Sequence, residues 1–398
     1  MRVLKFGGTS VADAIAFKRA IQIVREHTST PVVVVVSAMS GITDALISAN
    51  LDVIENHLQR HCEVAENLEL DFVAECRSMI ATATREIATL LNTDMAEINI
   101  RDAIAAYGET LCARLFTMIL EEHGIAASYV DARRCIVTDD RHGNANPLAR
   151  EVAMRTRAEL EPWLKMKRVP VLGGFIGATL DGVTTTLGRG SSDYSATLIG
   201  TALHADEIQI WTDVDGVQTA DPKLVSGTRT VPIISYDEAA QLAVLGARVM
   251  HPKMIEPVLR QTIPIRILNS RAPERDGTLI CAASEPSAGV VKAIAHRMNG
   301  THAVVGCVGD GLSNGNACAA LVRQVDSSLE WKSTAPSNLV ATVERERVPE
   351  IVRQVHERLF SHKRRITSDS RLRRSGRRAS WVMRGRRPAS NNQANRYR

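Results

Sequence analysis

The clearest structural signal in this chain is VVVVVSAMSGITD, residues 32–44. Five consecutive valines, Val32 to Val36, form a β-branched run that is typical of a strand buried on both faces of a parallel sheet. Ser37 ends the run, and a loop of small residues then leads into a helix. Hydroxyl groups and free backbone N–H groups therefore gather where the strand ends, which predicts a site for a polar ligand. A well-capped helix would produce the same pattern.

The first 280 or so residues repeat this alternation of short strands and longer helices. Residues 101–123 place apolar side chains on one helical face, and Gly124 follows as a C-cap. The alternation predicts an α/β sandwich with a mostly parallel sheet, in which ligands bind at the carboxyl ends of the strands. Further strands are expected at Arg2–Phe6, Val169–Leu172, Glu207–Trp211 and Ile263–Leu268.

The motif KFGGTS, residues 5–10, follows the first of these strands. Gly7 and Gly8 allow the backbone to approach a ligand closely, and N–H groups at a helix start suit an anion. Lys5 adds a positive charge. Ser10 with Asp13 matches a capping box, which predicts that a helix begins at Ser10. The G-x-x-x-x-G-K-[ST] pattern is absent, so this is not a P-loop, and a plain turn is the alternative interpretation.

The motif LGRGSSDYS, residues 187–195, combines glycine, serine and charge in nine positions. Arg189 offers a bidentate fork for a carboxylate or a phosphate. Asp193 suits the orientation of a cation or of a lysine near phosphate groups. A lone arginine or aspartate would more often form a surface ion pair, but the density of such residues here favours a binding loop.

The motifs WTDVDGV (211–217) and TADPK (219–223) end another strand in a turn of aspartate and glycine. Such a loop can hold the ribose and base of a nucleotide. Asp213 and Asp215 lack the remainder of a metal-ligand set, so we predict turn chemistry and no metal-ligating residues. Four loops of this kind in one α/β domain predict a phosphate-handling site that is built without a P-loop.

In order and spacing these segments resemble the amino acid kinase superfamily and, within it, the aspartokinases. The segments SAMSGITDAL, GRGSSDYSA, GARVMHP (246–252), VTDDRHGNANP (137–147) and GGFIGAT (173–179) carry the resemblance together with those above. The resemblance implies a catalytic domain at residues 1–285 that phosphorylates the β-carboxylate of L-aspartate to 4-phospho-L-aspartate. ATP with Mg²⁺ would supply the phosphoryl group, in the first step of lysine, threonine and methionine biosynthesis. The alternatives are a catalytically impaired amino-acid sensor of the same fold and a kinase for another carboxylate.

The resemblance also implies roles for individual residues. Glu109 would meet the substrate ammonium and Arg189 would clamp a substrate carboxylate, although pattern alone makes Glu109 a solvated charge on a helix face. Gln218 and Arg248 stand where these enzymes often have Tyr and Lys, which changes the shape of the group that meets ATP. The implied catalytic residues are Lys5, Asp193 and Arg248; the substrate-binding residues are Ser37, Thr43, Glu109, Arg189 and Ser192; the ATP-binding residues are Lys5, Gly7, Gly8, Thr212, Asp213, Gln218, Asp221, Lys223 and Arg248.

Residues 289–360 predict a small α+β domain. Val290–His296 resembles the opening strand of an ACT domain, and Ala303–Gly311 begins what resembles a second ACT unit, which continues to a helix ending at Phe360. We therefore expect an incomplete ACT-like regulatory region. The resemblance implies a homodimer formed through this region, whereas the loss of most of the first ACT unit argues against both that dimer and effector binding.

Residues 361–398 hold 13 basic residues and one acid, a local charge of +12, so the other 360 residues carry −7 against the chain's total of +5. The segment has few apolar residues and no periodicity, which predicts a disordered Arg-rich tail. Such a tail binds nucleic acid only non-specifically, through phosphates. We prefer the hypothesis that it is sequence foreign to the family, for instance from a shifted reading frame.

Composition favours a cytoplasmic protein. No stretch approaches ~20 uninterrupted apolar residues, so no transmembrane helix and no membrane partner are expected. The first ten residues are too glycine-rich for a signal peptide. The seven cysteines are odd in number and contain no C-x-x-C pair, which argues against a zinc site or a disulfide framework and for a reducing compartment.

Overall fold

The strand predicted at the five valines lies near the middle of an eight-stranded sheet. The computed structural model describes residues 1–247, 252–282, 290–310, 312 and 317–360. Strand β1 (Arg2–Phe6) pairs in parallel with β2 (Val32–Val36) on one side and with β7 (Glu207–Thr212) on the other. The sheet order is β3-β4-β2-β1-β7-β9-β10-β8, and within it only β9 and β10 pair antiparallel. The other strands are β3 (Ala127–Tyr129), β4 (Val169–Gly173), β8 (Ile233–Ser235), β9 (Ile265–Asn269) and β10 (Thr278–Cys281).

The sheet is apolar on both faces, as the valine run predicts. All five valines of β2 are buried, and Val33 and Val35 belong to a different apolar cluster from Val32, Val34 and Val36. Alternate residues of a strand point to opposite faces, so β2 contributes to the cores on both sides of the sheet. This is the arrangement of a strand covered by helices above and below.

Helices cover the two faces of the sheet. Helix α1 (Ala14–His27) and most of α6 (Glu97–Glu122) pack with Leu4 and Phe6, whereas α7 (Ala149–Lys165) and α8 (Ser192–Ala202) pack with Val3. The remaining helices of this region are α2 (Ile42–Ile47), α3 (Leu51–Leu58), α4 (Arg60–Asn67), α5 (Val73–Leu91), α9 (Tyr236–Val244) and α10 (Glu256–Leu259), with 3₁₀ turns at Gly8–Val11, Ala132–Arg134 and Pro252–Met254.

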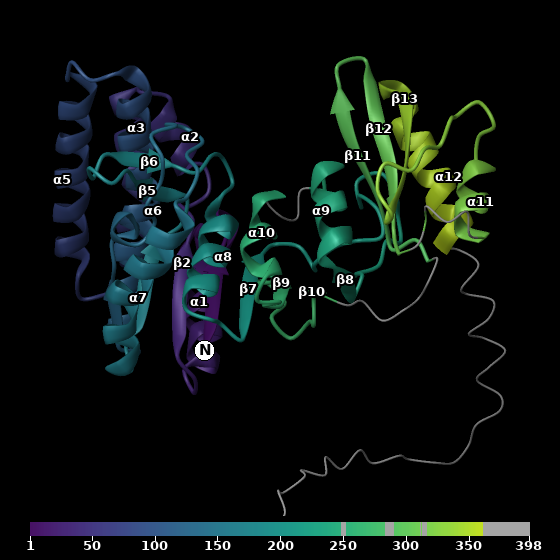
Figure 1. Ribbon diagram of the computed structural model, residues 1–398. Helices are drawn as coiled ribbons and strands as arrows, with labels where there is room; N and C mark the ends of the chain where they lie inside the picture. The colour runs from purple at the N-terminus through teal and green to yellow at the C-terminus, as the bar shows by residue number, and fades with distance from the viewer. Residues whose placement is uncertain (248–251, 283–289, 311, 313–316, 361–398) are drawn as a thin grey trace, which may run out of the picture. The chain divides into compact units, whose positions relative to one another are not determined.

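Helix α6 is the longest helix of the described chain and lies alongside α5 (Figure 1). It is long and apolar enough to cross a membrane by composition alone, but 72% of its most apolar window is buried inside the fold. Its start at Glu97 is four residues earlier than the expected 101. The helix reaches from the outer strand β3 to the centre of the sheet, so it can carry polar side chains to the carboxyl ends of the strands.

An aromatic cluster joins β1 to the helices on one face. Phe116 of α6 meets Phe6 edge-on at 5.7 Å between ring centroids and Phe17 of α1 at 5.4 Å. Phe6 also stacks on Trp211 of β7 at 6.4 Å. Aromatic pairs of this geometry add to the free energy gained from buried area. The cluster fixes β1, and with it the loop that follows β1, against α1 and α6.

The described residues after 290 form the small α+β region that the sequence predicts. Strands β11 (Ala293–Asn299), β12 (His302–Val308) and β13 (Asn338–Glu344) make an antiparallel sheet in that order, with α11 (Ala317–Arg323), a 3₁₀ turn at Arg345–Arg347 and α12 (Val348–Phe360) (Figure 1). A separate hairpin of the first region pairs β5 (Ile176–Ala178) with β6 (Thr184–Thr186). The expected domain boundary between residues 285 and 289 lies outside the described residues, and so does the expected Arg-rich tail 361–398. Both stay predictions.

We predict that Phe116→Ala lowers the free energy of unfolding by about 3–5 kcal/mol, because the substitution leaves a cavity between β1, α1 and α6. The measurement is the midpoint of urea or thermal unfolding. Met166→Ala is the matched control, since Met166 is 66% exposed and its truncation opens no cavity. Equal midpoints for the two variants would contradict the role of the aromatic cluster.

Candidate active site

A buried ion pair lies at the carboxyl edge of the sheet. The Nζ of Lys5 in β1 lies 2.6 Å from Oδ1 of Asp193 in the first turn of α8, and the two side chains are 9% and 11% exposed. Lys5 points to the α8 face because its neighbours Leu4 and Phe6 pack on the α1 face. Asp193 also lies at the positive end of the α8 dipole. The structure thus joins two residues that the sequence places 188 positions apart.

The loop after β1 is tied to the loop after β2. The Gly7 N–H donates to the carbonyl of Trp211 at 2.9 Å, and the Ser40 N–H donates to the carbonyl of Gly8 at 3.2 Å. A Cβ on Gly8 would lie 2.8 Å from the carbonyl oxygen of Ala38, so only glycine permits this approach. A Cβ on Gly7 would lie 3.5 Å from the Lys5 Nζ. The Lys5 ammonium therefore lies beside the glycine loop, where a phosphate would find positive charge.

The prediction that a helix begins at Ser10 is wrong, because α1 begins four residues later, at Ala14. Residues Gly8–Val11 form a 3₁₀ turn, and α1 begins only after Asp13. Asp13 is itself the N-cap, because its side chain accepts from the Ala16 N–H at 2.8 Å. The Ser10 hydroxyl instead donates to the carbonyl of Trp211 at 3.2 Å and meets the Ser270 hydroxyl at 2.8 Å. Ser10 therefore fastens the loop to β7 and β9 rather than capping a helix.

Glu109 is buried, so the pattern-based interpretation of a solvated charge is wrong. It lies in α6 and is 3% exposed. A Cβ on Gly173 would lie only 2.9 Å from the Glu109 Cβ, which shows how closely α6 approaches the end of β4. Burial raises the pKa of Glu109 to about 8, against the lowering effects of the Ala38 N–H and of the Lys5 charge. Its Oε2 has no hydrogen-bond partner among the described residues, so an external cation fits there.

Arg189 lies at the exposed mouth of the site. Its guanidinium pairs with Asp44, and the two side chains are 71% and 73% exposed. The pair joins the loop after β6 to α2, the helix that follows the loop after β2. Asp44 was not among the predicted site residues, although it lies in the same motif as Thr43. An exposed pair of this kind contributes ~0–1 kcal/mol and is easily exchanged for another carboxylate.

Three further predicted substrate residues surround this mouth. Ser192 is buried in the first turn of α8, next to Asp193. The Ser37 N–H donates to the carbonyl of Phe6 at 3.0 Å, which places Ser37 directly beyond the ends of β1 and β2. Thr43 is half-buried in α2. These residues frame the carboxyl ends of the two central strands.

The predicted nucleotide residues follow β7. The carbonyl of Thr212 accepts from the Ser270 N–H at 2.8 Å and from its hydroxyl at 3.0 Å. Asp213 lies 3.8 Å from Arg271. The Asp221 side chain accepts from the Lys223 N–H at 2.9 Å, which closes a turn. The remaining predicted positions are Gln218, whose amide donates to the Thr230 hydroxyl at 3.0 Å, Lys223, which is exposed, and Arg248, which lies outside the described residues.

The Asp215 side chain contacts the end of β9 and the segment after it rather than its own turn. It pairs with Arg275 and accepts from the Asn269 side-chain amide at 2.7 Å. Within the described ranges, no cluster of three or more His, Cys, Asp or Glu side chains has the arrangement of a metal site.

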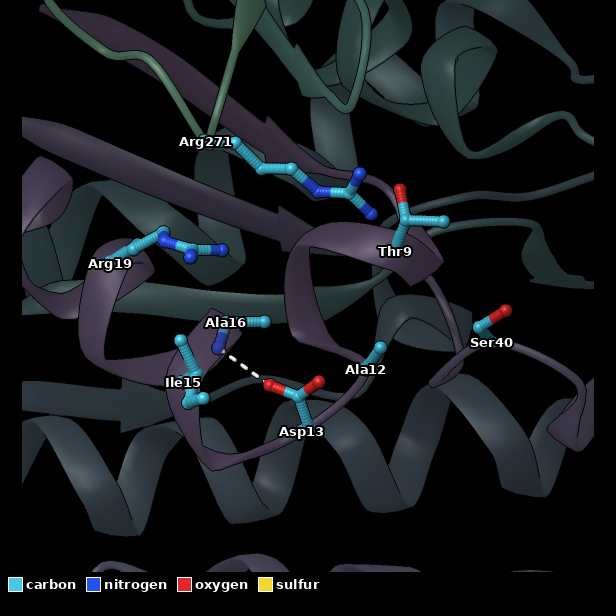
Figure 2. Close-up of a pocket in the computed structure, with 8 residues that line it drawn as sticks. All are labelled: Thr9, Ala12, Asp13, Ile15, Ala16, Arg19, Ser40 and Arg271. Atoms are coloured by element: carbon cyan, nitrogen blue, oxygen red, sulfur yellow. Dashed lines mark hydrogen bonds between the residues drawn. The ribbon is translucent and has the colours of Figure 1, made fainter.

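A cavity of about 350 Å³ lies behind the glycine loop, on its α1 side. Figure 2 shows Arg19 and Arg271 extending into it, with Thr9, Ser40 and the Asp13 cap around its rim. Lys5, Asp193 and Glu109 do not line this cavity. It is thus distinct from the polar cluster on the α8 side of the loop.

Asp102 is a buried polar residue that the sequence reasoning missed. It is 2% exposed and accepts hydrogen bonds from His142, Gly143 and Thr186. The sequence feature that indicates it is its spacing in α6: Asp102 lies seven residues before Glu109 and hence on the same helical face. The segment 137–147, which supplies two of these donors, carries part of the family resemblance, but the resemblance implies no role for its residues.

Residues 1–269 match the amino acid kinase family. The chain is 37% identical over 316 residues to lysine-sensitive aspartokinase 3 of Escherichia coli, which covers 75% of this chain and 68% of that protein. It is 36% identical over 319 residues to the chloroplastic aspartokinase 3 of Arabidopsis thaliana, covering 75% of this chain and 56% of that one. The chain therefore spans about two thirds of the bacterial relative and just over half of the plant relative.

Solved structures agree with these matches. Escherichia coli aspartokinase III in complex with aspartate and ADP, in its R-state, superposes with a TM-score of 0.82 at 28% identity, over 90% of this chain and 100% of that one. The same enzyme in complex with lysine and aspartate, in its T-state, gives 0.76 at 28% identity, over 90% and 99%.

We predict that Glu109→Gln becomes more stable than the wild type as the pH rises. The folded pKa of about 8 exceeds the ordinary value of 4.5, so folding binds a proton in this range, and wild-type stability falls between about pH 4.5 and 8. The glutamine variant avoids that loss, which amounts to a few kcal/mol. Melting temperatures at pH 5 and pH 9 measure the difference. Glu97→Gln, at an exposed position on the same helix, is the control. A difference in melting temperature between Glu109→Gln and the wild type that does not change with pH would contradict the raised pKa of Glu109.

Proposed function

The chain belongs to the aspartokinases of the amino acid kinase family, and we propose that its site at the carboxyl edge of the sheet phosphorylates L-aspartate. The terminal phosphoryl group of ATP is transferred to the side-chain carboxylate, giving 4-phospho-L-aspartate and ADP. One observation carries this proposal: the buried Lys5–Asp193 pair lies within electrostatic reach of Glu109, a buried carboxyl group with an unpartnered oxygen. A phosphate finds the positive charge of Lys5 there, and an ammonium finds a carboxyl group that it can ionise.

The reaction needs charge neutralisation rather than a general base. An aspartate side chain has a pKa of about 4, so it is already an anionic nucleophile at neutral pH. Its carboxylate oxygen attacks the terminal phosphorus, the bond to the bridging oxygen breaks, and ADP leaves with the electron pair. Lys5 and N–H groups of the glycine loop other than that of Gly7, which donates to Trp211, stabilise the phosphate charge. Positioning supplies most of the acceleration. Mg²⁺ bound to the ATP phosphates would neutralise further charge. Arg248 is proposed as a second cation for ATP.

Glu109 and Arg189 recognise the two ends of the amino acid backbone in this proposal. The substrate ammonium takes the unpartnered oxygen of Glu109, and its positive charge stabilises the ionised form of that buried carboxyl group. Arg189 exchanges its exposed partner Asp44 for the α-carboxylate of the substrate. Ser37, Thr43 and Ser192 complete the surroundings of the substrate.

Thr212, Asp213, Gln218, Asp221 and Lys223 line the nucleotide pocket in this proposal. The loop that carries them touches the C-terminal region: the Thr219 hydroxyl is hydrogen-bonded to the Nε2 of His356 in α12 at 2.9 Å. The Ile294 N–H of β11 donates to the Thr219 carbonyl at 2.9 Å. These contacts support a regulatory role for an ACT-like region at 289–360, next to a catalytic domain at 1–285.

The partners and location follow from the same reasoning. A homodimer through the ACT-like region is the assembly that the family resemblance implies. Nucleic acid would bind only non-specifically, through the Arg-rich tail. The seven scattered cysteines, with no C-x-x-C pair, favour a reducing cytoplasm.

A coupled assay of ADP release tests the proposed function. We expect turnover with L-aspartate and ATP, and little with L-glutamate, whose side chain is one methylene longer. Added lysine and threonine in the same assay report whether the shortened regulatory region still transmits an effector signal. Turnover with glutamate but not aspartate would assign the enzyme to another carboxylate, and no turnover with either would favour a sensor.

We predict that Lys5→Ala lowers turnover by at least about 10³-fold, because it removes the positive charge beside the glycine loop. The loss also leaves Asp193 buried without a counter-charge, which costs about 3–5 kcal/mol of stability. The double variant Lys5→Ala/Asp193→Asn removes that charge, so it should regain the melting temperature while remaining inactive. Turnover in the folded double variant would refute the role assigned to Lys5.

A further inference from the structure

Asp102 is a buried carboxylate that the proposed reaction does not use. Its Oδ1 accepts from the Thr186 hydroxyl at 2.6 Å. Its Oδ2 accepts from the N–H groups of Gly143 at 2.9 Å and Thr186 at 3.1 Å, and is bonded to the His142 Nδ1 at 3.0 Å. Four donors thus meet one carboxylate that is 2% exposed. A buried charge so fully satisfied is a strong and specific link between the elements that supply its donors.

The donors come from two segments, whose Thr138 and Thr185 hydroxyl groups are hydrogen-bonded at 2.7 Å. Gly143 and His142 lie in the segment 137–147, whereas Thr186 ends β6. The two segments also contact each other, since the Ala145 N–H donates to the Thr186 carbonyl at 2.9 Å. Asp102 therefore fastens both of them to α6.

Thr186 stands three residues before Arg189. Between them Leu187 is buried, and its N–H donates to the Phe175 carbonyl at 2.9 Å, so the turn that carries Arg189 begins at Gly188. Gly188 and Gly190 flank Arg189 with φ angles of 97° and 75°, conformations that glycine adopts freely. A Cβ on Gly188 would lie 3.0 Å from the Asn144 Oδ1, so the segment 137–147 forms one wall of this turn. The position of the turn therefore depends on where Thr186, Leu187 and Asn144 are held.

Asp102 and Glu109 share one face of α6. Seven residues are two helical turns, which separates the two positions by about 10 Å along the axis. Both side chains are buried against the sheet region. One rigid helix thus carries the proposed partner of the substrate ammonium and the anchor of the turn that presents Arg189.

We propose that Asp102 is a positioning residue that sets the separation between Glu109 and Arg189, and so adapts the site to a short α-amino dicarboxylate. The proposal rests on the proposed function, in which these two residues bind the ammonium and the α-carboxylate of aspartate. Displacement of the Arg189 turn weakens aspartate binding and admits the longer glutamate more readily. ATP binding is unaffected, since none of the residues hydrogen-bonded to Asp102 belongs to the proposed ATP-binding set.

Three variants separate the bonds of Asp102. Asp102→Ala removes all four. Thr186→Val removes only the hydroxyl bond. Asp102→Asn can keep all four hydrogen bonds. The asparagine Oδ1 accepts from the three N–H donors, and its Nδ2 donates to the Thr186 hydroxyl, so only the bond to that hydroxyl changes direction. We expect the KM for aspartate to rise about 10- to 100-fold in Asp102→Ala, less in Thr186→Val and under about threefold in Asp102→Asn, with the KM for ATP unchanged. The ratio of aspartate to glutamate turnover should fall in the same order.

Limited trypsin digestion provides a readout that does not require activity. Cleavage after Arg189 should be faster in Asp102→Ala and Thr186→Val than in the wild type, at a temperature where all are folded. Ile80→Ala is the matched control, since Ile80 is buried in α5 and contributes nothing to the turn. It should lower the melting temperature without changing the KM for aspartate or cleavage after Arg189.

Two results would overturn the proposal. One is an unchanged KM for aspartate in folded Asp102→Ala or Thr186→Val. The other is a parallel rise in the KM for ATP, matched by the Ile80→Ala control, which would make Asp102 a general stabiliser. If the wild type releases no ADP with aspartate, the proposed function fails on its own, whereas the digestion pattern still decides whether Asp102 holds the Arg189 turn.

Discussion

The burial of opposite charges between Lys5 and Asp193 is the constraint on which the site depends. Each charge would be costly alone in this environment, so the pair holds β1 and α8 in one relative position. That position places the Lys5 ammonium beside the glycine loop and the first turn of α8 next to it. The geometry of the phosphate-handling edge therefore follows from an electrostatic requirement rather than from loop sequence alone.

Glu109 shows that the same site is left electrostatically incomplete. Desolvation outweighs the nearby Lys5 charge, because the pKa of this carboxyl group is raised despite that lysine. The free chain thus holds an acid that a substrate ammonium would ionise. In the proposed function, this carboxyl group therefore favours a ligand that carries a positive charge at one end and carboxylates at the other, as aspartate does.

The network extends beyond the catalytic edge in two directions. Through Asp102, helix α6 holds the turn that presents Arg189. After β7, Thr219 is hydrogen-bonded to Ile294 of β11 and to His356 of α12, and a buried pair joins Lys292 to Glu238 at 2.8 Å. A few buried polar contacts therefore link the C-terminal sheet to the segment that follows β7.

Composition and local pattern were sufficient for the strand of five valines, the α/β sandwich and the loops KFGGTS and GRGSSDYSA, because each is encoded by neighbouring residues. They were insufficient for Glu109, Ser10 and Asp102. Helical periodicity says which side chains share a face, but only packing against the sheet decides that the face bearing Asp102 and Glu109 is buried. Ser10 likewise has the local sequence of an N-cap, but its hydroxyl contacts the hydroxyl of Ser270, 260 residues away, and does not cap a helix. Long-range burial is a property of the assembled sheet, so no local pattern can report it.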